Sequence, residues 1–245
     1  MRRLKFTTFS RIKRNEKWVV VLIGCLIEAG LVFGQPGKEV WIKVAQGNVL
    51  YLNPVGAEWT PVASKEKILV KTFLLTGESA DATIFRETET YHLPPNAYFF
   101  INDIFHRNRL EVIGALARIE AQQLPTNVAP DSQKVIGLTF GNSQLSGDEG
   151  DIPHENERRN AIIGFISQNN YAAALLSLKR MLTRYPSAYL SRNYAEQLFV
   201  LYDSLQLYGL LLDETKLLLQ IDTSKDFHQK FQEWHDYTQK KLLDE

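Results

Sequence analysis

The sequence predicts an α+β protein of more than one domain, in which an all-β sandwich or roll precedes an α-helical bundle. Short apolar alternations separated by turn residues run from about residue 40 to residue 124, a pattern typical of antiparallel sheets. From Glu155 onward the apolar side chains recur every three or four residues, which is the period of an amphipathic helix. We therefore expect a β domain over 35–125, a linker over 126–154 and a helical domain over 155–245.

The composition is that of a folded globular protein with an uneven distribution of charge. The 245 residues are 44% apolar, and 28 Lys and Arg balance 28 Asp and Glu. Residues 1–34 hold seven of the basic side chains and only two of the acidic ones, so the rest of the chain is acidic. An acidic body argues against nucleic acid as a partner. Cys25 is the single cysteine, which excludes a disulfide scaffold and a cysteine-ligated zinc site.

Residues 1–34 have the pattern of a secretory signal peptide. A basic stretch over 1–17 precedes an unbroken apolar run over 18–27, and a small residue follows before the expected cut. The cut is expected between Gly34 and Gln35, which would make Gln35 the new N-terminus. The sequence therefore predicts export.

Two alternatives remain open for this segment. Uncleaved, the apolar stretch 18–33 would be a signal anchor with its basic end in the cytoplasm. The run Leu22–Cys25 also resembles the lipobox of bacterial lipoproteins, in which Cys25 would be acylated. Each alternative places the body of the chain outside the cytoplasm, in the periplasm or elsewhere in the cell envelope. Membrane contact is expected only through 18–33, and only if the segment is uncleaved.

The β domain is expected to contain short strands separated by turns. Strands are predicted over 49–52, 58–62, 67–70, 73–75, 82–85, 91–93 and 98–101. Gly77 is expected to adopt positive φ in the turn after Thr76, and Pro94–Asn96 separates two strands. The stretch 110–120 fits a strand and a short helix equally well.

Several of these segments together resemble the FecR domain. The motifs are Gln46–Val49, Trp59–Val62, Leu74–Ser79, Ala82–Phe85 and Tyr91–Asn96, taken in this order. That domain occurs in bacterial periplasmic proteins, including regulators of iron-siderophore transport. The resemblance covers about residues 44–120 and implies a β fold outside the cytoplasm. It implies little about function, because the shared residues are those of turns and core.

The region between the two domains reads as a linker. The segments 125–133 and 141–151 are rich in Gly, Ser, Asn and acidic residues, and they flank 134–140, a candidate extra strand. The acidic run Asp148–Asp151 lacks the ligand spacing of an EF-hand calcium loop. A solvated linker is therefore expected there.

Five helical segments are expected after the linker. The first begins at Glu155, the second covers 171–185 and ends at Pro186, and the third follows Ser191 as its N-cap. Gly209 is expected to break the third helix, and 210–220 forms the fourth. The fifth is capped by Thr223 or Ser224 and buries one stripe, which comprises Phe227, Phe231 and Trp234.

The first helical pair resembles a tetratricopeptide hairpin over about 158–186. The residues at the typical positions are Phe165, Tyr171, Ala174, Leu178 and Pro186. The later helices fit this pattern only loosely, and a continuous solenoid needs about three repeats. A compact bundle, or a degenerate repeat packed against another part of the chain, is therefore expected.

No catalytic motif, metal site or cofactor site is predicted, so we expect a protein that is not an enzyme. The five histidines lack partners at metal-ligand spacing, and no nucleophile elbow or phosphate-binding loop occurs. Besides its core stripe, the third helix carries a second apolar face, and this second face includes Phe199 and Tyr202. This surplus predicts contact with another envelope protein through Phe199 and Tyr202, or coverage by the β domain.

Two further functions remain open. FecR-type regulators hold a sigma factor with a cytoplasmic helical domain, but only about 17 residues precede Trp18. The chain could instead be a related envelope signalling component. Alternatively, the β domain could bind glycan or peptidoglycan through exposed aromatic rings such as Tyr98, Phe99 and Phe100.

Overall fold

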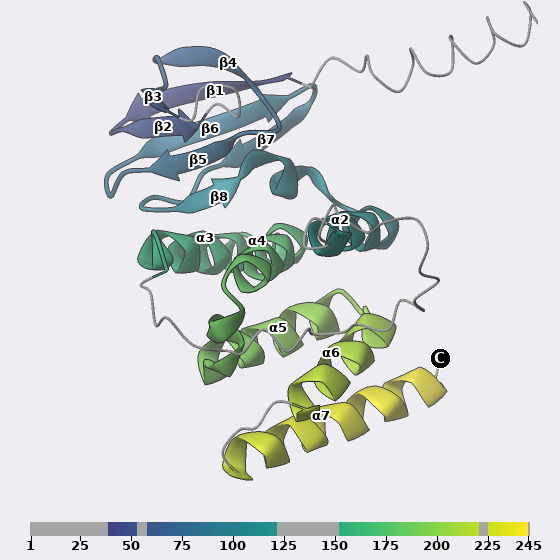
Figure 1. Cartoon of the computed structure of the whole chain (residues 1–245). Helices are drawn as coiled ribbons and strands as arrows, with labels where there is room; N and C mark the ends of the chain where they lie inside the picture. The colour runs from purple at the N-terminus through teal and green to yellow at the C-terminus, as the bar shows by residue number, and fades with distance from the viewer. Residues whose placement is uncertain (1–38, 53–57, 122–151, 221–224, 245) are drawn as a thin grey trace, which may run out of the picture. The chain divides into compact units, whose positions relative to one another are not determined.

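The computed structural model describes residues 39–52, 58–121, 152–220 and 225–244 (Figure 1). Within these ranges, an antiparallel β region of two sheets is followed by six α-helices, as the α+β prediction requires. The segment 1–34, Cys25, the strand expected at 134–140 and the caps Thr223 and Ser224 lie outside the described residues. The described residues belong to one compact unit.

Each of the two sheets has four strands. Sheet A has the order β4-β1-β6-β7, formed by β4 (Lys65–Leu69), β1 (Glu39–Gln46), β6 (Asp81–Arg86) and β7 (Glu89–His92). Sheet B has the order β3-β2-β5-β8, formed by β3 (Trp59–Pro61), β2 (Val49–Leu52), β5 (Phe73–Thr76) and β8 (Tyr98–Phe100). All pairings are antiparallel, and the predicted strands are confirmed to within a few residues.

The alternation along each strand decides which side chains enter the core. Val40 and Ile42 of β1 are buried, and so are their partners Ile68 of β4 and Ile84 of β6. Leu74 of sheet B belongs to the same core and is fully buried. One face of each strand is therefore apolar because successive side chains point to opposite faces of a sheet.

The turn residues of the FecR-like motifs meet at one corner of the β region. Gly77 donates its backbone N–H to the carbonyl of Asn48 (2.8 Å), and its own carbonyl accepts from the N–H of Asn96 (2.9 Å). The hydroxyl of Thr76 donates to the carbonyl of Pro94 (2.7 Å) and accepts from the N–H of Ala97 (2.8 Å). These bonds satisfy buried polar groups where three segments of the chain cross.

The positive φ expected at Gly77 is wrong, and Gly47 adopts it instead, with φ of 76°. An added Cβ at Gly47 would lie 2.7 Å from the Cα of Ala80 and 2.7 Å from the carbonyl oxygen of Ser79. Glycine is required there for both reasons, since a side chain would be strained and would also clash. Local turn chemistry therefore pointed to the wrong glycine of the pair.

The stretch 110–120 is a helix rather than a strand. The chain leaves β8 through a 3₁₀ helix, η1 (Ile101–Phe105), and enters α2 (Arg109–Ala121). Val112, Leu116 and Ile119 of α2 are buried at helical spacing. The side chain of Asn108 accepts from the N–H of Glu111 and so caps the start of the helix.

Five helices and a second 3₁₀ segment follow the linker. They are α3 (Glu155–Ser167), α4 (Tyr171–Arg184), η2 (Pro186–Leu190), α5 (Arg192–Ser204), α6 (Tyr208–Gln220) and α7 (Lys225–Asp244). The predicted end at Pro186 and the stripe of Phe227, Phe231 and Trp234 are confirmed. Gly209 does not break a helix, because it lies in the first turn of α6 and the chain turns before it, where Gln206 has φ of 53°.

The helices repeat as pairs with the same spacing along the chain. α3 and α5 begin at Glu155 and Arg192, and α4 and α6 begin at Tyr171 and Tyr208. The pair α3–α4 lies next to the β region, α5–α6 lies beyond it, and α7 packs on α6 (Figure 1). The loose fit to a second repeat in the sequence thus corresponds to a second helical pair in the structure.

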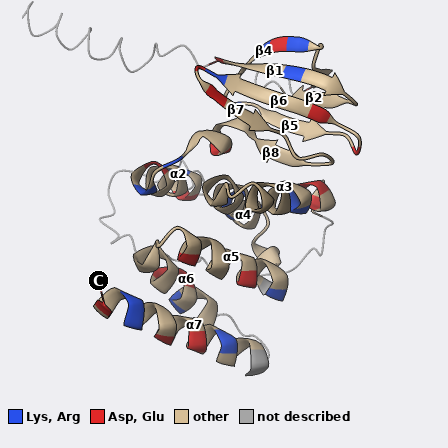
Figure 2. Ribbon diagram, turned by 180° about the vertical axis from the view of Figure 1, so that it is seen from behind, with Lys and Arg blue, Asp and Glu red and all other residues tan. Residues whose placement is uncertain are grey.

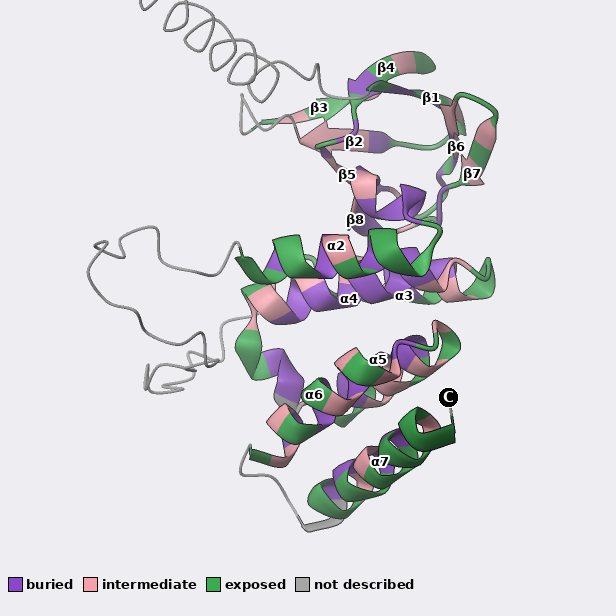
Figure 3. Cartoon of the chain, turned by 90° about the vertical axis from the view of Figure 1, so that its right-hand side faces the viewer, coloured by how far each residue is buried: buried purple, intermediate pink, exposed green. Residues whose placement is uncertain are grey.

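The β region and the first helical pair share a core. The ring of Phe99 in β8 meets the ring of Phe165 in α3 edge to face, with centroids 5.3 Å apart. Gly164 of α3 lies against Pro94, so that an added Cβ would overlap the Cβ of Pro94. Figure 3 shows buried positions along α4, between the β region and the outer helices. The separability of the two domains stays a prediction.

Candidate functional site

The two residues expected to contact a partner are covered by the chain's own helices. Tyr202 is 2% exposed, and its hydroxyl lies 3.5 Å from Oε2 of Glu214 in α6. Phe199 is half-buried and stacks on Trp234 of α7 with centroids 4.7 Å apart. The chain itself therefore covers this face of α5, and it does so with α6 and α7 rather than with the β domain.

Exposed apolar residues recur instead at equal spacing along the chain, in α3, α5 and α7. Ile163 of α3, Val200 of α5 and Tyr237 of α7 are 49%, 51% and 38% exposed. They follow one another at the spacing that separates α3 from α5. We call these three residues the apolar row.

The helices of the apolar row contact each other in turn: α3 contacts α5, and α5 contacts α7. The hydroxyl of Tyr194 in α5 donates to Oε1 of Glu155 in α3 (2.7 Å). The hydroxyl of Tyr237 in α7 donates to Oδ1 of Asp203 in α5 (2.9 Å), and its ring lies 5.7 Å from that of Phe199. The apolar row thus belongs to three neighbouring helices. Sequence reasoning missed it, although alignment of the chain with itself at this spacing would have matched the three positions.

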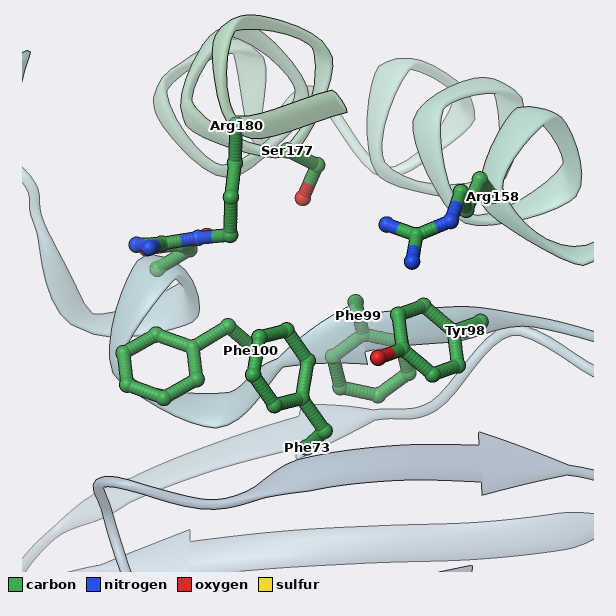
Figure 4. Close-up of a pocket in the computed structure, with 8 residues that line it drawn as sticks. Phe73, Tyr98, Phe99, Phe100, Arg158, Ser177 and Arg180 are labelled. Carbon is green, nitrogen blue, oxygen red and sulfur yellow. The ribbon is translucent and has the colours of Figure 1, made fainter. Parts of the chain in front are cut away.

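The three aromatic residues expected to bind glycan pack against the helices. Tyr98 and Phe99 are 9% and 2% exposed, and Phe100 is half-buried. The guanidinium of Arg158 in α3 lies 4.1 Å from the ring of Tyr98, and that of Arg180 in α4 lies 4.4 Å from the ring of Phe100 (Figure 4). The β8 aromatics therefore belong to the junction with the helices, and the exposure expected of them is wrong.

The cavity at this junction is small. It measures about 10 Å³ and lies among Phe73, Tyr98, Phe100, Arg158 and Ser177 (Figure 4). The hydroxyl oxygen of Ser177 is buried there without a hydrogen-bond partner in the described part of the chain. A volume of this size holds about one water molecule. The junction is consequently a packed interface and offers no room for a substrate.

Asp103 and Arg180 form a charged pair beside this cavity. Nε and Nη2 of Arg180 lie 3.1 Å and 2.8 Å from the two carboxylate oxygens of Asp103, which is 1% exposed. Burial raises the pKa of the Asp103 carboxyl above its usual range, although Arg180 acts in the opposite direction. Burial likewise lowers the pKa of the nearby His106.

A second charged pair lies deep among the helices. Nζ of Lys179 in α4 lies 2.8 Å from Oε2 of Glu214 in α6 and donates to the hydroxyl of Tyr189 (3.0 Å). Burial acts to lower the pKa of Lys179, but Glu214, Tyr202 and Tyr189 together outweigh it, and the pKa lies well above its usual value. Lys179 and Glu214 are 4% and 8% exposed, so this pair joins three elements rather than meeting a ligand.

The described residues provide no metal-binding cluster. The ranges 39–52, 58–121, 152–220 and 225–244 contain no group of His, Cys, Asp and Glu side chains that could hold a metal ion. His154 stacks instead on Tyr98, with ring centroids 5.3 Å apart.

No helix in the described part of the chain has the length and apolarity of a membrane span.

Comparison of the chain with protein-family models, with curated proteins and with solved structures finds no match. The FecR-like and tetratricopeptide-like resemblances therefore stay predictions, and the geometry described above is the basis for a functional assignment.

Proposed function

We propose that this protein is a non-enzymatic protein-interaction scaffold of the bacterial cell envelope. The observation that supports it most directly is the apolar row, in which Ile163, Val200 and Tyr237 are exposed at equal spacing along the chain, in the neighbouring helices α3, α5 and α7. Apolar side chains scattered singly on a surface need no explanation, whereas exposed apolar residues that gather on neighbouring helices are candidates for an interaction surface.

Burial of the apolar row would contribute enough free energy to anchor a partner protein. Full burial of a large aliphatic side chain stabilises a complex by about 1.5–3 kcal/mol. Each residue of the row still exposes between 38% and 51% of its surface, so three of them would contribute roughly 3 kcal/mol together. That contribution corresponds to about a hundredfold in affinity, with the surrounding polar residues supplying specificity.

The location rests on the sequence. The export pattern of residues 1–34 and the FecR-like motifs over 44–120 both favour a protein of the periplasm or cell envelope. The partner is accordingly another envelope protein, which would contribute apolar side chains to the row. The resemblance of 158–186 to a tetratricopeptide hairpin supports the same reading, because stacked helical pairs form extended binding surfaces.

Retention of a partner from bacterial envelope extract tests the proposal. Residues 35–245 serve as bait, beside a row variant with Ile163→Ser and Val200→Ser. Tyr237 is left unchanged because its hydroxyl donates to Asp203 and its ring contacts Phe199, so that its loss would disturb the packing of α7. The matched control carries Leu110→Ser and Leu243→Ser, which change apolar residues that are 81% and 87% exposed but stand outside the row. We expect the bait and the control to retain the same envelope protein and the row variant to lose it.

Loss of the partner from both variants, or retention by both, would contradict a role for the apolar row. Phe199→Asp is unsuitable for this test, because Phe199 stacks on Trp234 and the substitution would disturb the packing of α7. The circular dichroism of each variant shows whether its helices are intact.

A further inference from the structure

The outer face of sheet A carries an exposed aromatic ring among lysine side chains. Val40 and Ile42 of β1 point into the core, so the residues between and after them, Trp41 and Lys43, point outward. Trp41 is 44% exposed, although a tryptophan on a sheet is usually covered. Nζ of Lys65 in β4 lies 5.1 Å from the centroid of the Trp41 ring.

Two of these lysines oppose each other directly across neighbouring strands. The register of β1 and β4 pairs Lys43 with Lys65, and both are exposed. No carboxylate in the described ranges lies within ion-pair distance of either one, whereas the neighbouring Lys67 pairs with Glu39. Like charges opposite each other in a sheet destabilise it. An anionic group bound between Lys43 and Lys65 would relieve this repulsion.

Hydrogen-bonding side chains lie beside Lys43 on the next two strands of sheet A, β6 and β7. Lys43 pairs in register with Thr83 of β6, and Thr83 pairs with His92 of β7. Oγ1 of Thr83 and Nδ1 of His92 lie 3.5 Å apart, and His92 is exposed. Trp41 lies two residues before Lys43 on the same face of β1, and its partner in β6 is Phe85. Figure 2 shows the basic positions on the neighbouring strands β1 and β4.

We infer that this face binds a glycan whose sugar rings carry carboxylate groups. The apolar C–H face of a pyranose ring packs on the exposed part of Trp41, and the carboxylate lies between Lys43 and Lys65. The sugar hydroxyls reach Thr83 and His92, which both donate and accept hydrogen bonds. This site goes beyond the proposed protein contact, because it lies on sheet A and uses none of the apolar row.

The chemistry of the face favours such a glycan over other ligands. A neutral glycan would leave the two lysines unpaired, and an acidic peptide without rings would leave Trp41 exposed. A membrane surface would require several protruding apolar side chains, but Trp41 and Leu69 are the large apolar residues that are clearly exposed on this face of the described sheet.

Calorimetric titration of the full chain with defined polymers tests the inference. The probe is oligogalacturonate, which combines pyranose rings with carboxylates. Dextran supplies the rings alone, polyglutamate supplies the carboxylates alone, and vesicles of phosphatidylglycerol represent an anionic membrane. We expect oligogalacturonate to bind at least about tenfold more tightly than dextran and polyglutamate, since each lacks one half of the recognition.

Variants assign the binding to residues. Lys43→Gln with Lys65→Gln, and separately Trp41→Ala, are each expected to weaken oligogalacturonate binding about tenfold or more. The matched control, Lys216→Gln with Lys240→Gln, removes two exposed lysines from the helices and should bind as the unchanged chain does. The apolar-row variant should also bind normally, which separates failure at this site from failure of the proposed function.

Three results would overturn the inference. They are the absence of saturable binding to oligogalacturonate, equal binding of polyglutamate, and unchanged affinity in both the lysine and the tryptophan variants. Preferential binding to the vesicles would likewise replace the glycan with a membrane surface. The four residues substituted in the two lysine variants, Lys43, Lys65, Lys216 and Lys240, are all exposed, so we expect both variants to fold, and circular dichroism checks this.

Discussion

The guanidinium of Arg180 in α4 donates two hydrogen bonds to the carboxylate of Asp103 in η1, although the two residues are 77 positions apart in the chain. The carboxylate is almost fully buried, and the same guanidinium covers the ring of Phe100 at the end of β8. One side chain of the helical region therefore neutralises a buried charge of the β region and shields its last strand. This pair therefore links the helical region to the β region directly.

Arg180→Ala should lower the stability of the chain strongly. The substitution leaves Asp103 buried without its counter-charge, a change that typically costs about 3–5 kcal/mol. Urea unfolding measures the loss. The control is Arg192→Ala, which breaks the exposed pair of Arg192 with Glu196 and should cost less than about 1 kcal/mol. Equal losses in the two variants would show that the buried pair does not join the regions.

Gly164→Ala and Gly209→Ala should have opposite effects. The new methyl group at Gly164 would overlap Pro94 and push α3 away from the β region, at a cost of about 1–3 kcal/mol. Nothing lies within 4 Å of a Cβ added at Gly209 in the first turn of α6. Alanine there should stabilise the helix by up to about 1 kcal/mol. Thermal unfolding compares the two, and a stabilising Gly164→Ala would disprove the close packing of α3 on Pro94.

The contact between Tyr194 and Glu155 predicts a loss of stability at alkaline pH. Burial, followed by the hydrogen bond to the Glu155 carboxylate, raises the pKa of Tyr194 to about 12, against about 10 in the unfolded chain. Because the pKa is raised by folding, the contribution is complete below about pH 10 and is lost as the pH rises towards about 12. Urea midpoints measured across this window should therefore fall more steeply for the unchanged chain than for Tyr194→Phe.

Tyr237 offers a matched comparison for this effect. Its hydrogen bond to Asp203 also raises its pKa to about 12, but the residue is 38% exposed, so solvent screens the interaction. Tyr237→Phe should accordingly change the alkaline slope less than Tyr194→Phe does. A larger change in Tyr237→Phe would contradict the burial of Tyr194.

Lys43→Glu should raise stability while it removes glycan binding. The substitution turns the like-charged pair of Lys43 and Lys65 into an opposite-charged one, which is worth about 0.2–1 kcal/mol in a cross-strand pair. Thermal unfolding should show a rise of a few degrees, and titration with oligogalacturonate should show no binding. A lower melting temperature would mean that the two ammonium groups do not repel each other in the folded chain.

Cleavage between Gly34 and Gln35 is expected when the chain is exported. Intact mass and N-terminal sequencing of the protein from the envelope fraction measure the outcome, and the mature chain should begin at Gln35. Retention of Met1 to Gly34 would instead identify a signal anchor. An acyl group on Cys25 would identify a lipoprotein.

Local patterns in the sequence determined most helix ends and the strands β2 to β8, whereas β1 (Glu39–Gln46) was not among the predicted strands. The alternation along Ala82–Phe85 and the breaks at Asn170 and Pro186 act over a few residues, so these predictions needed no knowledge of distant contacts. The stretch 110–120 could not be resolved in this way, because its short apolar runs fit either period. Packing of Val112 and Leu116 in the core accompanies its helical form.

Tertiary structure alone decided which surfaces are open and which residues meet. The amphipathic pattern of α5 shows two apolar faces but cannot show that Trp234 covers Phe199, since that contact joins helices far apart in the chain. Gly47, rather than Gly77, has positive φ, and it lies against the backbone of Ala80, which is distant in the chain. Lys43 and Lys65 likewise oppose each other only through strand register. The spacing of apolar residues along a segment indicates which of its faces is apolar. Which other segment packs on that face depends on contacts between residues far apart in the chain, and only the tertiary structure shows them.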